Sequence, residues 1–211
     1  MHIPGAFRQD DIAAMHALMR AHPLATLVTL GPSGLAANHI PLLVDPHGPY
    51  GTLRGHVARA NPVWREFDAV QGALAVFAGP DAYVTPSWYP AKAETGKVVP
   101  TWNYAVVHAA GPLVVHDDPA WVLSLVTALT QTHEAGRVEP WQVGDAPADY
   151  VERMVAAVVG IEIPIRCLEG KWKMSQNRSA ADREGVARGL QADDVAHAAT
   201  MAAWILPDRG V

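Results

Sequence analysis

YVTPSWYPAKAETGKVVPTWNY, residues 83–104, is the stretch of sequence that decides the fold. It combines five aromatic rings with prolines, two lysines and several hydroxyls. Prolines break the hydrogen bonding of a core strand, and this much exposed aromatic surface is unfavourable in a simple connecting loop. The stretch therefore predicts a rigid loop that leads into a strand and covers a flat ligand. Its lysines and hydroxyls suit an anionic group on that ligand.

The composition of the whole chain predicts one ordered globular domain over residues 1–211. Half of the residues (50%) are hydrophobic and 18% are charged, which is enough apolar surface for a core. We find no apolar run that could cross a membrane and no signal-peptide pattern in the opening MHIPGAFRQDD, so we expect a cytoplasmic protein. The net charge of −5 argues against a broad basic surface for nucleic acid, although a local patch stays open.

Short strands separated by Gly/Pro turns make up most of the sequence. We expect strands at 24–30, 35–44, 51–59, 73–78, 82–85, 101–116 and 160–168, with a turn at 79–80 and a bend, bulge or break at 111–112. We expect helices after residue 10 or 11, after 61–62, after 118–119, over 147–159 and, as a C-terminal extension, over about 179–206. The first two strands form a hairpin, which breaks strict βαβ alternation. The pattern thus predicts a mainly antiparallel α+β barrel with inserted helices.

The usual catalytic motifs are absent from the sequence. It has no GxGxxG, Walker loop, HExxH or GxSxG, and no clear acid–base pair, so whether the protein is an enzyme stays open. His39, His56 and His108 fall in separate expected strands and could converge in a barrel. Isolated strand histidines that bond a neighbour or face water are commoner, and we assign no metal site. The lone Cys167 excludes an internal disulfide and is expected to be an inert core thiol.

Three segments carry unusual polar residues. Asn38-His39 interrupts an apolar strand, and residues 54–61 place an arginine, a glycine and a histidine just before a helix start that can bind an anion. The third is the opening stretch, which offers the side chains of Thr85, Ser87, Lys92, Lys97, Thr101 and Asn103. Each has a structural alternative: a buried Asn that pins a turn, a solvated strand end and an interface loop. Their occurrence together in one barrel-like fold favours a binding site.

Five segments resemble those of the PaiB-type FMN-binding negative transcriptional regulators, a family of the FMN-binding split-barrel group. They are ANHIPLLVD (37–45), LRGHVARANPVW (53–64), VFAGPDAYVTPSWYP (76–90), KVVPTWNYAVVHAAG (97–111) and LEGKWKMSQNR (168–178). The likeness extends from residue 1 to about residue 188. It implies a six-stranded antiparallel split β-barrel with peripheral helices. It also implies a homodimer that binds FMN at the subunit interface.

The resemblance also implies where FMN contacts the chain. We expect its phosphate near Arg54, His56 and Asn61, with Ser87 and Lys92 as further candidates. Side chains expected nearer the ribityl chain or the ring are Asn38, His39, Trp88, Thr101, Trp102 and Asn103. The segment 171–178, which includes Lys173, either closes the flavin pocket from the partner or forms a small basic patch for nucleic acid or an acidic partner. A surface strand followed by a helix cap is its structural alternative.

Two functions fit these expectations. The first is an FMN-binding regulatory protein that acts through a redox- or ligand-dependent conformation. The second is a small FMN-dependent oxidoreductase without direct DNA binding, in which the cofactor supplies the chemistry. A dimer that keeps the barrel but has lost the cofactor is a third reading, against which the intact motifs count. Direct DNA binding lacks support from charge or from a basic recognition helix.

Overall fold

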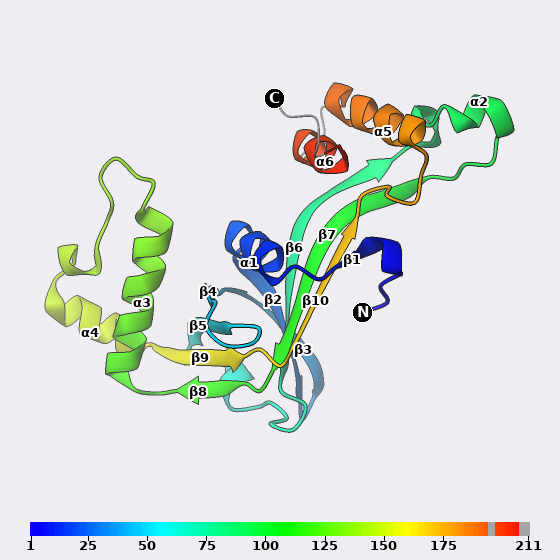
Figure 1. The fold of residues 1–211 in the computed structure, drawn as a ribbon. Coiled ribbons are helices and arrows are strands. Elements are labelled where there is room, and N and C mark those ends of the chain that lie inside the picture. Colours follow the sequence, from blue (N-terminus) through cyan, green and yellow to red (C-terminus); the bar gives the residue numbers. More distant parts are fainter. Residues whose placement is uncertain (194–196, 207–211) are drawn as a thin grey trace. The chain divides into compact units, whose positions relative to one another are not determined.

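The computed structural model describes residues 1–193 and 197–206, and the chain divides into two compact units (Figure 1). The first unit comprises 1–18, 78–107 and the segment from 169 onward, and the second comprises 19–77 and 108–168. No helix of the described residues has the length and apolar character needed to cross a membrane.

The first unit is built on long antiparallel strands and two C-terminal helices. Its elements are η1 (Gly5–Phe7), β1 (Arg8–Gln9), most of α1 (Ile12–Ala21), the second half of β6 (Ala73–Val84), η3 (Pro86–Trp88), α2 (Ala91–Thr95), the first part of β7 (Thr101–Gly111), β10 (Cys167–Lys173), α5 (Ala180–Ala192) and α6 (Ala198–Ile205). Strands β1, β10, β7 and β6 are neighbours in that order. Helix α5 packs on α6 and on η3.

The second unit holds a hairpin and a four-stranded sheet covered by helices. Its elements are β2 (Leu24–Gly31), β3 (Gly34–Pro41), β4 (Leu43–Asp45), β5 (Thr52–Ala58), η2 (Pro62–Trp64), β8 (Val114–His116), α3 (Pro119–Glu134), η4 (Val143–Asp145), α4 (Ala148–Ala156) and β9 (Val158–Pro164). Strand β2 lies between β3 and the first half of β6, and the second sheet has the order β4-β5-β9-β8. Helix α3 packs on β5 and β9, and α4 packs on α3 and β9 (Figure 1).

Several helix starts follow directly from their capping residues. The Asp118 carboxylate accepts a hydrogen bond from the Ala120 amide, next to a proline at the first helical position of α3. Ser179 caps α5 in the same way through the Asp182 amide. These starts, and the hairpin β2–β3, are confirmed as predicted. The fold class is also confirmed: both sheets are antiparallel, with helices around them and at the C-terminus.

Five local predictions are wrong. Residues 73–84 form one strand, β6, and not two strands joined by a turn; Gly79 is needed because a Cβ there would lie 2.8 Å from Cδ1 of Leu18. The strand expected over 35–44 breaks before β4, and residues 158–159 begin β9 and do not end a helix. The strand expected over 160–168 is divided between β9 and β10. Cys167, expected in the core, is exposed.

The helices α5 and α6 lie within the predicted C-terminal segment, of which residues 194–196 are outside the described residues. The single domain over 1–211 stays a prediction.

Candidate functional site

A small polar pocket lies in the first unit where β7 meets the end of β10. It has a volume of about 90 Å³ and is lined by Tyr89, Val99, Thr101, Asn103, Lys173, Ser175, Asn177 and Arg178. We call it the Lys173 pocket. Thr101 and Asn103 reach it together because alternate residues of a strand share one face. Its volume is below the roughly 150 Å³ of a cavity that holds benzene, so it suits a small group and not a ring system.

Hydrogen bonds hold several of the side chains that line the Lys173 pocket. The Lys173 ammonium donates to the Thr101 hydroxyl at 2.5 Å and to the carbonyl oxygen of Trp102. The fully buried Asn103 amide donates to the Ser175 hydroxyl at 3.0 Å. Ser175 has a left-handed backbone (φ 61°), which is costly for a residue with a side chain. Strain of this kind is common at ligand sites, and here it turns the chain after β10 toward the pocket.

The pocket has an excess of positive charge. The pKa of Lys173 is lowered, first by burial and then by the charges of Lys171 and Arg178. Arg178 lies over the Tyr89 ring, 4.8 Å from its centroid. Among the described residues, no carboxylate forms an ion pair with Lys173 or Arg178. Two clustered cations beside hydroxyl and amide groups are the donors that a phosphate group requires.

The rest of the opening stretch divides into packed and exposed rings. Trp88 packs on α5, where a Cβ on Gly189 would lie 2.3 Å from its ring. Trp102 keeps 54% of its surface exposed and contacts Tyr83 edge-on, with ring centroids 5.9 Å apart. Trp102 is therefore the most exposed ring of this stretch, ahead of Tyr83 at 47%, and its surface is open to stacking on a flat ligand.

Lys92 and Ser87, predicted as further phosphate ligands, contact each other. The Lys92 ammonium donates to the Ser87 hydroxyl at 3.1 Å. The first unit thus brings together two groups of predicted residues: Thr101, Asn103 and Lys173 in the pocket, and Ser87 with Lys92 on the loop.

In the second unit, Asn38 and Asn61 are joined by a hydrogen bond. The Asn61 amide donates to the Asn38 carbonyl oxygen at 2.7 Å, and Asn61 also accepts from the Val63 amide at the start of η2. His39 lies 3.2 Å from the Thr26 hydroxyl on the neighbouring strand. The pair Asn38–Asn61 therefore anchors the turn that follows β5.

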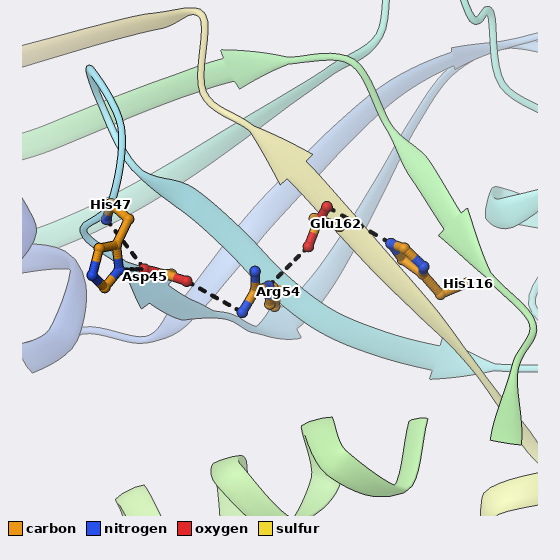
Figure 2. Close-up of polar contacts among 5 residues, drawn as sticks. All are labelled: Asp45, His47, Arg54, His116 and Glu162. Carbon is orange, nitrogen blue, oxygen red and sulfur yellow. Dashed lines mark hydrogen bonds and ion pairs between the residues drawn. The ribbon is translucent and has the colours of Figure 1, made fainter. Parts of the chain in front are cut away.

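Arg54 lies at the centre of a row of charged side chains that crosses the second sheet (Figure 2). Its guanidinium donates to Glu162 at 2.8 Å on β9 and pairs with Asp45 at 3.2 Å on β4. His47 bonds Asp45 at 2.5 Å, and His116 lies 3.7 Å from Glu162. We call these five residues the Arg54 row. Since two carboxylates already compensate Arg54, a phosphate would have to compete with both of them.

One carboxylate of the Arg54 row has a shifted pKa. The pKa of Asp45 is lowered, chiefly by its hydrogen bonds from His47 and to a smaller extent by the charge of Arg54. A cavity of about 250 Å³ lies beside Asp45 and Arg54, under the α3 residues Trp121 and Ser124. The row therefore combines an anchored guanidinium with a histidine at each end.

His56 faces a different environment from its neighbour Arg54. Its ring lines an apolar cavity of about 270 Å³ formed with α3, η4, α4 and β9. Burial lowers its pKa, so the imidazole is neutral near pH 7. A neutral imidazole is a weaker ligand for phosphate than a cation.

Sequence reasoning missed several residues of these sites. Ser175, Asn177 and Arg178 of the Lys173 pocket lie in the segment 171–178, which was predicted either to close the pocket or to form a basic patch, but only Lys173 was chosen from it as a ligand. The signal was available in the clustering of two lysines and an arginine within eight residues. Asp45 and Glu162, the partners of Arg54, gave no sequence signal. Strand pairing sets Glu162 of β9 opposite Arg54, and it sets Asp45 of β4 opposite Thr52, two positions before Arg54. The described residues hold no cluster of three or more His, Cys, Asp or Glu side chains suited to a metal.

Comparison with known sequences gives one family and several relatives. A family described as "Putative FMN-binding domain" matches residues 1–167. An uncharacterised protein of Aspergillus fumigatus is 34% identical, with 90% of this chain and 91% of the relative covered. The "Protease synthase and sporulation protein PAI 2" of Bacillus subtilis is 29% identical, with 96% of this chain and 95% of the relative covered.

Solved structures share the fold at low identity. A flavocytochrome from Azotobacter vinelandii has a TM-score of 0.59 at 14% identity, over 81% of this chain and 72% of that one. An FAD and haem binding protein from Mycobacterium smegmatis has a TM-score of 0.56 at 16% identity, over 79% and 73%. These likenesses support the split-barrel architecture.

Proposed function

The chain belongs to the family of FMN-binding domains and its cofactor is FMN; on this premise we propose that it binds FMN as a homodimer, with the phosphate in the Lys173 pocket. The observation that carries the proposal is the pair of cations, Lys173 and Arg178, which lack a carboxylate partner among the described residues. The family match ends at residue 167, so the role of this pocket is argued from the geometry of this chain.

A phosphate fits the Lys173 pocket in size, charge and hydrogen bonding. The group is close to a dianion at neutral pH and accepts charge-assisted hydrogen bonds from Lys173 and Arg178. The Thr101 hydroxyl, which now accepts from Lys173, is free to donate its own proton. The sequence-based alternative, with the phosphate at Arg54, His56 and Asn61, stays a prediction. At that place Arg54 is already held by ion pairs, His56 lines an apolar cavity, and Asn61 caps the start of η2.

We place the flavin ring at the exposed indole of Trp102. Flat π systems stack on aromatic faces, and this ring is half exposed, one residue from Thr101 of the Lys173 pocket. The ring cannot enter the pocket itself, because the pocket is too small for three fused rings. The bound flavin supplies hydride or electron chemistry, and the protein binds, orients and partly desolvates it.

A regulatory role through FMN is the first candidate function. The relative from Bacillus subtilis aligns over 96% of this chain, and its name refers to protease synthesis and sporulation. The net charge of −5 favours regulation through another protein over direct DNA contact. The same charge also suits the second candidate, a small FMN-dependent oxidoreductase that does not bind DNA.

Titration of the apoprotein with FMN and with riboflavin tests the proposal. We expect FMN to bind at least about 100-fold more tightly than riboflavin, because only FMN carries the phosphate. Equal affinities would overturn the phosphate assignment, and failure to take up FMN would overturn flavin binding. Light scattering on the loaded protein should give the mass of a dimer; a monomer that retains FMN would contradict that part.

Two further assays separate the candidate functions. Rapid reduction of the bound flavin by NADH or NADPH, followed by turnover with an electron acceptor, favours the oxidoreductase. Absence of turnover favours the regulator. A gel shift that weakens steeply with salt would restore direct DNA binding.

A further inference from the structure

The apolar cavity beside His56 belongs to the second unit, and flavin binding does not use it. It lies where α3, η4 and α4 meet β5 and β9, and we call it the α3–α4 cavity. Valines from three elements form most of its wall: Val126 on α3, Val151 on α4 and Val158 on β9. The lining, all of it within the described residues, includes no charged side chain.

Large apolar side chains at this cavity stay in contact with water. Trp141, Tyr150 and Met154 line it and are 48%, 47% and 45% exposed. Three such side chains around one hollow form a patch that ligand or partner binding would cover. Two of the three are aromatic, which favours a flat occupant.

His56, one of the residues that line the α3–α4 cavity, carries a buried polar atom without a partner. Its Nδ1 is buried and makes no hydrogen bond, and no described residue bonds the other ring nitrogen. A buried nitrogen without a partner costs free energy that a ligand can recover. Because burial keeps the imidazole neutral, it can accept a hydrogen bond from a neutral donor.

We propose that the α3–α4 cavity is a second ligand site, which binds a neutral one- or two-ring aromatic molecule through a single N–H or O–H donated to His56. A volume of about 270 Å³ exceeds the roughly 150 Å³ of a cavity that holds benzene and suits one or two rings. The uncharged lining excludes anionic and cationic ligands, because a buried charge would have no partner there. The site goes beyond FMN binding and stands without it.

Neutral aromatic probes test the site directly. 1-Naphthylamine, a neutral two-ring amine with an N–H donor whose fluorescence changes in apolar surroundings, should bind with one-site saturation. 2-Naphthol and naphthalene should displace it, with 2-naphthol the tighter by about tenfold, since only 2-naphthol donates a hydrogen bond. In His56→Phe, which retains a ring but has no acceptor, this preference should fall to about twofold or less. No saturable binding, or an unchanged preference in the variant, would overturn the proposal.

Matched valine substitutions separate the cavity from general surface binding. Val126→Phe fills the cavity and should weaken probe binding at least tenfold, whereas Val138→Phe, at a fully exposed valine of the same unit, should leave it within twofold. Equal effects of the two substitutions would overturn the site. If Val126→Phe does not fold, Ala146→Phe at the half-buried edge gives the same test. FMN titrations of each variant show separately whether flavin binding persists.

Discussion

The Lys173 pocket and the Arg54 row are two ways of placing cations in one chain. In the Arg54 row, the guanidinium lies between Asp45 and Glu162, and its charge is compensated inside the protein (Figure 2). In the Lys173 pocket, the pKa of Lys173 is lowered first by burial and then by the nearby charges of Lys171 and Arg178. The ion pairs of the Arg54 row stabilise the sheet. The uncompensated cations of the Lys173 pocket lower the stability of the protein until an anion binds.

The difference shows that a cation identifies an anion site only through its partners. Arg54 stands in a motif that resembles a flavin-binding family, yet its guanidinium is paired with a carboxylate from the strand on each side, Asp45 and Glu162. Lys173 and Arg178 have hydroxyls, amides and a tyrosine ring around them. The predictions below test whether phosphate binding follows the uncompensated charge.

The largest effect is expected from removing both cations of the Lys173 pocket. Lys173→Gln with Arg178→Gln should weaken FMN binding by about 100-fold or more, because two charge-assisted hydrogen bonds are lost. Riboflavin affinity should change little. Fluorescence titration with both flavins measures this, and Lys97→Gln, an exposed lysine of the same unit, is the control. A loss shared equally by FMN and riboflavin would mean that the substitutions damage the fold and not the phosphate site.

Substitution of Arg54 should lower the stability of the protein and not its preference for FMN over riboflavin. Arg54→Met leaves Asp45 and Glu162 facing each other without compensation, and should lower the free energy of unfolding by about 1–2 kcal/mol. Arg153→Met, which breaks a surface pair with Asp149, should cost less than about 0.5 kcal/mol. Urea unfolding of the apoproteins compares the two. If Arg54→Met instead preserves stability and abolishes the preference for FMN over riboflavin, the placement predicted from sequence is correct.

Much of the fold could be predicted because local chemistry determines it. Asp118 and Ser179 mark helix starts through their caps, and alternating apolar residues mark the hairpin β2–β3. The turn predicted at residues 79–80 was wrong, because glycine there serves close packing on Leu18. A glycine that allows contact and one that allows a turn look the same in sequence.

Less of the candidate site could be predicted, because partners come from distant strands. Residues 101–103 and 173–175 are about seventy positions apart and meet through the pairing of β7 with β10. Trp88 and Trp102 look equivalent in sequence, but only Trp88 has the glycines of α5 against it. The roles proposed for the remaining predicted residues depend on FMN and stay predictions.

The pH dependence of FMN binding is expected to follow Lys173. Its pKa lies below the ordinary 10.5 in the folded apoprotein, so it loses its proton earlier than an exposed lysine when the pH rises. FMN affinity should fall through that range in the wild type and stay flatter in Lys173→Gln. Without FMN, the stability of the protein should change with pH in the opposite sense. Folding disfavours the charged form of Lys173, so the stability of the wild type relative to Lys173→Gln should rise as the pH approaches 10.5. FMN titrations and apoprotein unfolding curves over the same pH range measure both effects. If FMN affinity and relative stability both rise or both fall with pH, the prediction is contradicted.

The smallest effect is expected at the end of the Arg54 row. His47 lowers the pKa of Asp45 more than Arg54 does, although the His47 ring is largely exposed. His47→Ala should therefore raise the pKa of Asp45 toward 3.8 while costing less than about 0.5 kcal/mol at neutral pH. Because the folded pKa is lowered, the stabilisation from Asp45 is complete above 3.8 and is lost as the pH falls through the folded value. The variant should lose it at a higher pH, and NMR titration of the Asp45 carboxyl carbon would measure the shift. An unchanged Asp45 pKa would assign the shift to Arg54, and the row would then depend on its central cation alone.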